Sequence, residues 1–230
     1  MNWWSRVLDF VSPRYCVVCD GRLAPTERTL CSACLMRLPR TTFQFAPEDN
    51  VMAQLFWGLA PVCRAAALFY YQPHADDARV VYQLKYGDRP DVGEDMGRLM
   101  AGEMRFADYF GGVDLLVPVP LSPRRLRQRG YNQSESLALG VSQATGIPVC
   151  RQALCRRHFR QSQTRLSRRE RQENVSGMFY VSHPERLCDR HIMLIDDVCT
   201  TGATLTACCD ALKGVPGVTV SVLTLCFTER

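Results

Sequence analysis

Residues 191–205, HIMLIDDVCTTGATL, decide the fold of this chain. An apolar run at 192–195 ends in two carboxylates, Asp196 and Asp197, and small hydroxylated residues follow. An amphipathic segment then runs from Leu205 to Leu212. This order predicts a buried strand at 191–195, a turn, and a helix at 203–214.

The predicted turn suits an anion, because free backbone N–H groups and the dipole of the following helix point toward it. Gly202 lets the backbone approach the anion closely, and the threonine hydroxyls add donors. The candidate phosphate-binding residues are Thr200, Thr201, Gly202, Ala203 and Thr204.

The two carboxylates stand at the carboxyl end of the predicted strand, where α/β sheets place their ligands. Asp196 and Asp197 suit a ribose diol or a divalent cation. Together with the turn they predict a site for a ribose 5-phosphate. The alternative is an ordinary strand, turn and helix in which an aspartate caps the helix.

The other predicted elements alternate between strands and helices. We expect strands at 63–71, 114–119, 179–181 and 219–227, and a short strand beginning at 148–150. Helices are expected at 3–11, 76–86, 91–109 (interrupted by Gly97 and Gly102) and 133–144. Residues 41–61 are expected to be a connector. This alternation predicts an α/β fold with a parallel sheet and right-handed crossovers.

Length and composition fit one large domain with a small module. The chain has 230 residues, of which 47% are hydrophobic and 22% charged. No apolar run approaches the roughly 20 residues that cross a bilayer. Residues 1–15 lack the pattern of a secretory signal, so we expect a cytoplasmic protein without a membrane span.

Four of the twelve cysteines form two CxxC pairs separated by eleven residues. The four are Cys16, Cys19, Cys31 and Cys34. Without a secretory signal, this spacing favours a structural Zn²⁺ site over disulfides, and an iron–sulfur cluster fits a compact pair of knuckles less well. The alternative is four buried thiols that hold no metal.

Arginine dominates the basic residues, since lysine occurs only at positions 85 and 213. Four arginines lie at 124–129 and eight lie at 151–171. Guanidinium groups match phosphate oxygens in pairs, so both clusters could hold pyrophosphate or nucleic acid. A solvated face is the alternative.

Residues 195–204, IDDVCTTGAT, resemble the phosphoribosyl pyrophosphate (PRPP) loop of the type I phosphoribosyltransferases. The order of motifs along the whole chain is similar to that of the ComF family of competence-associated proteins. Those motifs are the four cysteines, LKYGDR at 84–89, VPVPL at 117–121, RGYNQ at 129–133, Q-x-x-L at 163–166 with Arg171 and Asn174, and the PRPP loop.

The resemblance implies a type I phosphoribosyltransferase-like parallel sheet flanked by helices, with a small N-terminal zinc module. It implies three parts: a helix and zinc module at 1–40, a connector with a strand and helices at 41–112, and a phosphoribosyltransferase-like domain at 113–230. It also implies that PRPP binds with Mg²⁺, that Asp196 and Asp197 are catalytic, and that residues 156–171 form a flexible loop, with Arg156, Arg165 and Arg171. The pyrophosphate would lie on Val119, Pro120, Leu121, Ser122, Arg125 and Arg129.

Three functions stay open at this point. The resemblance implies a protein of uptake and use of external DNA, and an enzyme that transfers phosphoribose to an acceptor the sequence does not identify. The alternatives are a non-catalytic sensor of PRPP or nucleotides, and an adaptor that binds single-stranded DNA or a DNA-uptake protein. Lys85 either contacts the substrate or is a solvent-facing end of its helix.

Overall fold

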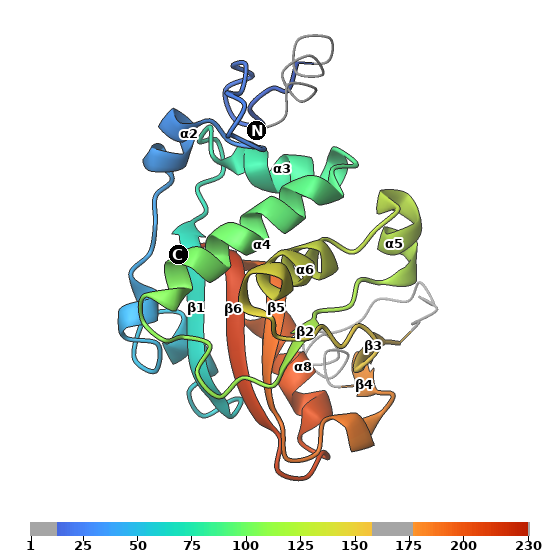
Figure 1. Ribbon diagram of the computed structural model, residues 1–230. Helices are drawn as coiled ribbons and strands as arrows, with labels where there is room; N and C mark the ends of the chain where they lie inside the picture. Colours follow the sequence, from blue (N-terminus) through green and yellow to red (C-terminus); the bar gives the residue numbers. More distant parts are fainter. Residues whose placement is uncertain (1–12, 158–176, 230) are drawn as a thin grey trace, which may run out of the picture.

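The computed structural model describes residues 13–157 and 177–229. Its centre is a parallel sheet of four strands in the order β1-β6-β5-β2 (Figure 1). The strands are β1 (Val62–Tyr70), β2 (Leu115–Pro118), β5 (His191–Cys199) and β6 (Thr219–Phe227). They are almost wholly buried, as expected of a parallel sheet with both faces covered.

Helices cover this sheet. Figure 1 shows α4 (Pro90–Arg105) and α6 (Gln133–Thr145) across one face, with α8 (Ala203–Leu212) behind the sheet. Helix α3 (Ala78–Tyr86) lies beside the amino end of α4. The expected α/β class, with a parallel sheet flanked by helices and an N-terminal module of four clustered cysteines, is confirmed.

Shorter elements complete the described chain. They are α2 (Ser32–Arg37), α5 (Pro123–Arg129), the antiparallel pair β3 (Leu154–Arg156) and β4 (Phe179–Val181), and 3₁₀ turns at Phe43–Phe45, Ala53–Phe56 and Pro184–Arg186. The expected strand at 148–150 is reduced to one parallel bridge between Val149 and Leu116. The helix expected at 3–11 lies outside the described residues, as do Arg165 and Arg171.

The structure differs from the predicted elements at two places. Strand β5 does not end at residue 195 but continues through Asp196 and Asp197 to Cys199, because β6 runs alongside it to Phe227. Residues 123–129, for which the sequence predicted no helix or strand, form a short helix. Pro123 occupies the first turn of this helix, and the Ser122 hydroxyl accepts a hydrogen bond from the Arg125 N–H at 3.3 Å.

Helices α4 and α6 cross at glycines, which brings their backbones together. A Cβ on Gly97 would lie 2.1 Å from the Leu137 carbonyl oxygen, and one on Gly140 would lie 2.0 Å from the Glu94 carbonyl oxygen. Helix α4 therefore runs unbroken through Gly97 and Gly102, contrary to the expected interruption. Gly97 is a contact residue, not a break in the helix.

Replacing Gly97 by alanine is expected to lower the free energy of unfolding by about 2 kcal/mol, because α6 must move away from α4. Gly102 lies on the same helix, and a Cβ there would have nothing within 4 Å, so Gly102→Ala is the matched control. That control should stabilise the protein by about 0.5–1 kcal/mol through helix propensity alone. Urea denaturation measures both changes, and equal shifts of the same sign would show that the crossing is not tight.

Candidate functional site

Two buried aspartates on β5 form the centre of the site. The Asp196 carboxylate accepts hydrogen bonds from the Ser134 hydroxyl at 2.8 Å and from the Asp197 N–H at 2.9 Å. The Asp197 carboxylate accepts one from the Val198 N–H at 2.7 Å. Its other oxygen, Oδ2, is buried without a hydrogen bond and lies 3.3 Å from Lys85 Nζ. Lys85 thus joins α3 to the sheet by a charge contact across the site.

Burial raises the pKa of Asp196 to about 7, and the negative charge of Asp197 adds to this shift. The Ser134 hydroxyl, the Asp197 N–H and Lys85 act in the opposite direction but are outweighed. Near neutral pH Asp196 is therefore partly protonated. A group that binds this pair has a donor and an acceptor available at the same carboxylate.

The raised pKa of Asp196 predicts a pH dependence of stability. The unfolded group ionises near 3.8 and the folded group near 7, so the folded state binds more protons between these values. Its contribution to stability is therefore fully present below about pH 3.8 and is lost as the pH rises toward 7. Asp196→Asn removes the ionisation while its amide oxygen still accepts from Ser134.

As the pH rises from 4 to 7.5, we expect the free energy of unfolding of the variant, relative to that of the wild type, to increase by on the order of 3 kcal/mol. Chemical denaturation at a series of pH values measures the difference in the free energy of unfolding between variant and wild type. The contributions of the other titrating groups are the same in both proteins and cancel in this difference. Asp210→Asn, an exposed carboxylate on α8, is the control. Parallel pH profiles for wild type and Asp196→Asn would contradict the shift.

The predicted phosphate-binding residues lie where β5 passes into α8. They line a small hollow of about 30 Å³, and its lining is completed by Asp196, Val198, Cys199 and Leu205. The predicted residues in it are Thr200, Thr201, Gly202, Ala203 and Thr204. The first-turn N–H groups of α8 have no partner within the helix and face the loop. Gly202 has φ +72° and precedes the first helical residue, a conformation that glycine adopts without strain.

The expected reason for Gly202 needs correction. A Cβ at this position would lie 3.2 Å from the Phe56 ring and 3.4 Å from Leu55 Cβ. The glycine is therefore required by its positive φ and by packing against the turn at 53–56, and a side chain there would not project into the hollow. Phe56 is buried and supports the loop from behind, although residues 41–61 were expected to be only a connector.

A cavity of about 300 Å³ joins the carboxylates to the other predicted residues. Asp196 and Asp197 line it with Val119, Pro120, Leu121, Arg125, Arg156, Thr200, Thr204 and Lys85. The structure thus brings together segments from β2, α3, β3, β5 and α8. Ser122 caps α5 beside this cavity, and Arg129 lines a neighbouring groove.

Sequence reasoning missed two polar residues at the start of α6. The Ser134 hydroxyl holds Asp196, and Gln133 lines the cavity with its Oε1 buried and without a hydrogen bond. Both follow Asn132, whose side chain accepts from the Ser134 N–H at 3.2 Å. The run RGYNQ contained this signal, because a capped helix start beside a strand end places its first side chains toward the ligand.

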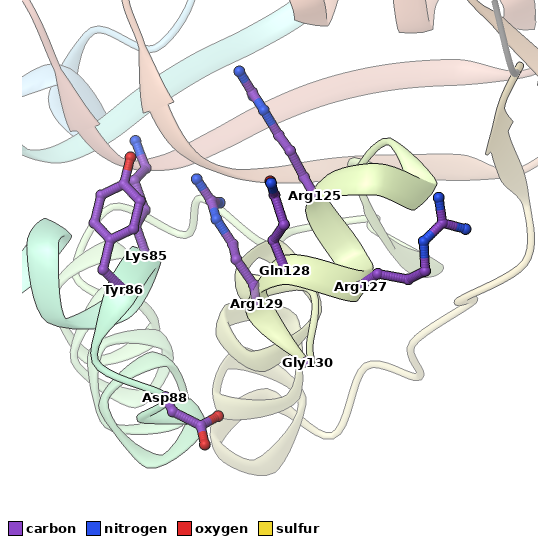
Figure 2. Close-up of a pocket in the computed structure, with 8 residues that line it drawn as sticks. All are labelled: Lys85, Tyr86, Asp88, Arg125, Arg127, Gln128, Arg129 and Gly130. Carbon is purple, nitrogen blue, oxygen red and sulfur yellow. The ribbon is translucent and has the colours of Figure 1, made fainter. Parts of the chain in front are cut away.

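The neighbouring groove is larger, about 890 Å³, and shares Lys85 and Arg125 with the cavity. Figure 2 shows the side chains of its lining between the end of α3 and α5. The two hollows are therefore adjacent, and Lys85 stands between them. Lys85 is not a solvent-facing helix end, since its Nζ lies 3.3 Å from Asp197 Oδ2, and its contact with a substrate stays a prediction.

The four predicted metal-ligating cysteines converge in the N-terminal module. One sulfur from each of Cys16, Cys19, Cys31 and Cys34 lies within 4.8 Å of the others. Burial acts to raise the pKa of Cys16, but hydrogen bonds from the backbone of Cys19, Cys31 and Val18 outweigh it and lower the pKa to about 7. Cys16 is therefore partly a thiolate at neutral pH, the form that binds a metal, whereas burial and hydrogen bonds with the other three cysteines raise the pKa of Cys34.

The module is attached to α3 by polar contacts. Arg79 of α3 lies 2.8 Å from the Asp20 carboxylate, and it donates a hydrogen bond to the Val18 carbonyl at 2.6 Å. Val18 and Asp20 both flank Cys19. The segment that carries Cys19 therefore supports the N-terminal end of α3, whose last turn bears Lys85.

Within the described residues, no helix combines the length and apolar character that crossing a bilayer requires.

Comparison with known proteins gives relatives along nearly the whole chain. The DNA utilization protein YhgH of Escherichia coli O157:H7 is 31% identical over 216 residues, which cover 93% of this chain and 90% of that protein. YhgH of Salmonella typhi is 29% identical over 227 residues, covering 94% and 98%. Competence protein F of Haemophilus influenzae is 25% identical over 203 residues, covering 83% and 86%.

No family model matches the chain. Two solved structures are similar over 61% of it. One is the allosteric regulatory enzyme of purine biosynthesis, with a TM-score of 0.42, 21% identity and 29% of that chain covered. The other is a glutamine PRPP amidotransferase from B. subtilis, with a TM-score of 0.40, 20% identity and 30% of that chain covered. Similarity at this level supports no inference about the site.

Proposed function

The chain belongs to the ComF family, and from this premise we propose that it binds PRPP, or a related ribose 5-phosphate, in the use of external DNA. The observation that carries the proposal is the common cavity of the buried Asp196–Asp197 pair and the start of α8. In this proposal the 5-phosphate lies on Thr200–Thr204. The ribose hydroxyls lie on the two carboxylates, because Asp197 Oδ2 is buried and lacks a hydrogen bond.

The pyrophosphate of PRPP would lie on the other side of the carboxylates. Backbone at 119–122 and the Arg125 side chain line that part of the cavity, and Arg156 closes it from β3. Burial lowers the pKa of Arg156, but guanidinium stays charged throughout the physiological range. Mg²⁺ would enter with the pyrophosphate, and when bound it would neutralise the charge on the departing group.

In an enzyme of this kind, the residues of the chain act by position and charge. Asp196 and Asp197 favour positive charge that develops at the anomeric carbon, while the arginines favour the departing anion. The bond that forms is from an acceptor nitrogen to that carbon, and the bond that breaks joins the carbon to the pyrophosphate oxygen. A sensor without catalysis would use the same contacts and release no pyrophosphate.

We further propose that the cysteine cluster holds one structural Zn²⁺. Four thiolates close the coordination sphere, so the metal has no open position for a substrate. The metal would stabilise the folded N-terminal module, which has little core of its own. A cytoplasmic location is part of the same proposal, since thiols stay reduced there.

Calorimetry on the full chain with zinc retained tests the ligand. Ribose 5-phosphate and PRPP with Mg²⁺ are titrated separately, and at least one is expected to bind at or below millimolar concentration. Release of pyrophosphate from PRPP, with candidate acceptors present, then separates the enzyme from the sensor. Absence of binding by both ligands would overturn the proposal for this site.

A further inference from the structure

The groove of about 890 Å³ beside the carboxylates has a lining in which basic side chains predominate. Lys85, Tyr86 and Asp88 contribute from the end of α3 and the turn after it, and residues 125 and 127–130 contribute from α5 and its C-terminal glycine. Lys85 and Arg125 also line the cavity of the carboxylates. A molecule in the groove would therefore lie next to the proposed ribose site.

The charges of the groove favour an anion. Arg125, Arg127 and Arg129 have no carboxylate within ion-pair distance among residues 13–157 and 177–229, whereas Lys85 is paired with Asp197. Arg129 Nη1 is buried and donates no hydrogen bond within the same residues. A buried guanidinium N–H without an acceptor is unfavourable, so an anionic group on the ligand would satisfy it.

The groove also offers one aromatic ring. Tyr86 is 66% exposed, and the Arg129 guanidinium lies 5.4 Å from the centre of its ring. Figure 2 shows Lys85, Arg125, Arg129 and the Tyr86 hydroxyl directed toward the same side, while Arg127 and Asp88 point away. A planar ring can stack on Tyr86 while a carboxylate on it meets the fork of Arg129.

We propose that this groove is the acceptor site and that the acceptor is a planar nitrogen heterocycle carrying a carboxylate. The inference rests on the proposed function, because it assigns the second substrate of that site. Tyr86 binds the ring, and Arg129 binds the carboxylate. When a ring nitrogen bonds to the anomeric carbon, the electron pair of the broken carbon–oxygen bond leaves with the pyrophosphate, and a proton on that nitrogen passes to water.

Matched pairs of probes test the charge requirement. Nicotinate is compared with nicotinamide, and orotate with uracil, by ligand-observed NMR on the full chain, with and without ribose 5-phosphate. We expect the anionic member of at least one pair to bind ten- to a hundredfold more tightly, as a charged hydrogen bond predicts. Arg129→Gln should remove this preference, and Tyr86→Ala should weaken the anionic probe about tenfold while Tyr86→Phe retains it.

The chain supplies controls of the same residue types. Tyr82 cannot serve, because its ring centre lies 5.2 Å from that of Tyr86, but Tyr15 is 54% exposed in the N-terminal module and does not line the groove. Arg124 is exposed on α5 and also lies outside the lining. Tyr15→Ala and Arg124→Gln should leave probe binding unchanged.

The outcomes separate the two proposals. If ribose 5-phosphate binds but neither pair of probes shows a preference for the anion, or if neither pair binds, the acceptor assignment is wrong while the proposed function stands. If the anionic probe binds through Tyr86 and Arg129 but neither ribose 5-phosphate nor PRPP binds, the proposed function fails, and the acceptor role fails with it. Equal effects of Tyr15→Ala and Tyr86→Ala would also overturn the assignment.

Discussion

Replacing Cys16 and Cys31 together by serine is expected to abolish metal binding and to unfold the N-terminal module. The two residues come from different CxxC pairs, so each pair loses a ligand and the remaining two sulfurs cannot close a tetrahedral site. A structural zinc site of this kind contributes on the order of 10 kcal/mol to folding, which exceeds what so small a module gains from its own core.

Elemental analysis of purified protein measures the metal, and limited trypsin digestion measures the state of the module. Wild type should hold one zinc per chain and resist cleavage at Arg22 and Arg28, whereas the double variant should lose both properties. Cys63→Ser with Cys188→Ser is the control, since neither residue belongs to the cluster. Zinc retained in full by the double variant would contradict the assignment of these ligands. Iron in place of zinc in the wild type would show that the identity of the metal was wrong.

Asp197→Asn is expected to weaken binding of ribose 5-phosphate or Mg²⁺–PRPP ten- to a hundredfold. The substitution keeps the size of the side chain and removes the charge at Oδ2, which faces Lys85 and the cavity. Loss of one charged hydrogen bond costs about 1.5–3 kcal/mol, and this sets the expected factor. The same change leaves Lys85 without its partner carboxylate.

Calorimetry on wild type and Asp197→Asn measures the loss, with thermal denaturation as a check that both are folded. Asp210→Asn on α8 is the matched control, because Asp210 pairs with Lys213 and lies outside the cavity. Unchanged affinity in Asp197→Asn, with a folded protein, would place the ligand elsewhere and remove the main support for the proposed function.

Much of the fold could be predicted because its signals are local. The apolar run at 192–195 and the alternation of strands and helices indicate a parallel sheet directly, and the last strand was predicted with its observed bounds. The extent of β5 was not predictable in the same way. Asp196 and Asp197 do not favour strand, and they remain in it only because β6 pairs alongside them.

In the candidate site, too, the features with local signals could be predicted and those that depend on long-range packing could not. The cysteine spacing and the PRPP-like loop are contiguous motifs, so their convergence could be foreseen. The contact between Lys85 and Asp197 joins positions far apart in the chain, and only the packing of α3 on the sheet produces it. The role of Gly202 was misjudged for a related reason. Its neighbour in space is Phe56, which lies far away in the sequence, in a segment that carries no motif. The division into parts at residues 40 and 112 stays a prediction.

The order of the strands has a consequence for synthesis on the ribosome. Among the named strands of the described residues, β1 pairs only with β6, which is made last and whose residues are about 150 positions later, while its other edge is bridged by residues 39–41 made just before it. At roughly 5–20 residues per second, β1 waits on the order of ten seconds for its partner. During that time the edge of β1 that later pairs with β6 stays open in the nascent chain, and an open edge on an apolar strand exposes the growing polypeptide to aggregation and to binding by chaperones.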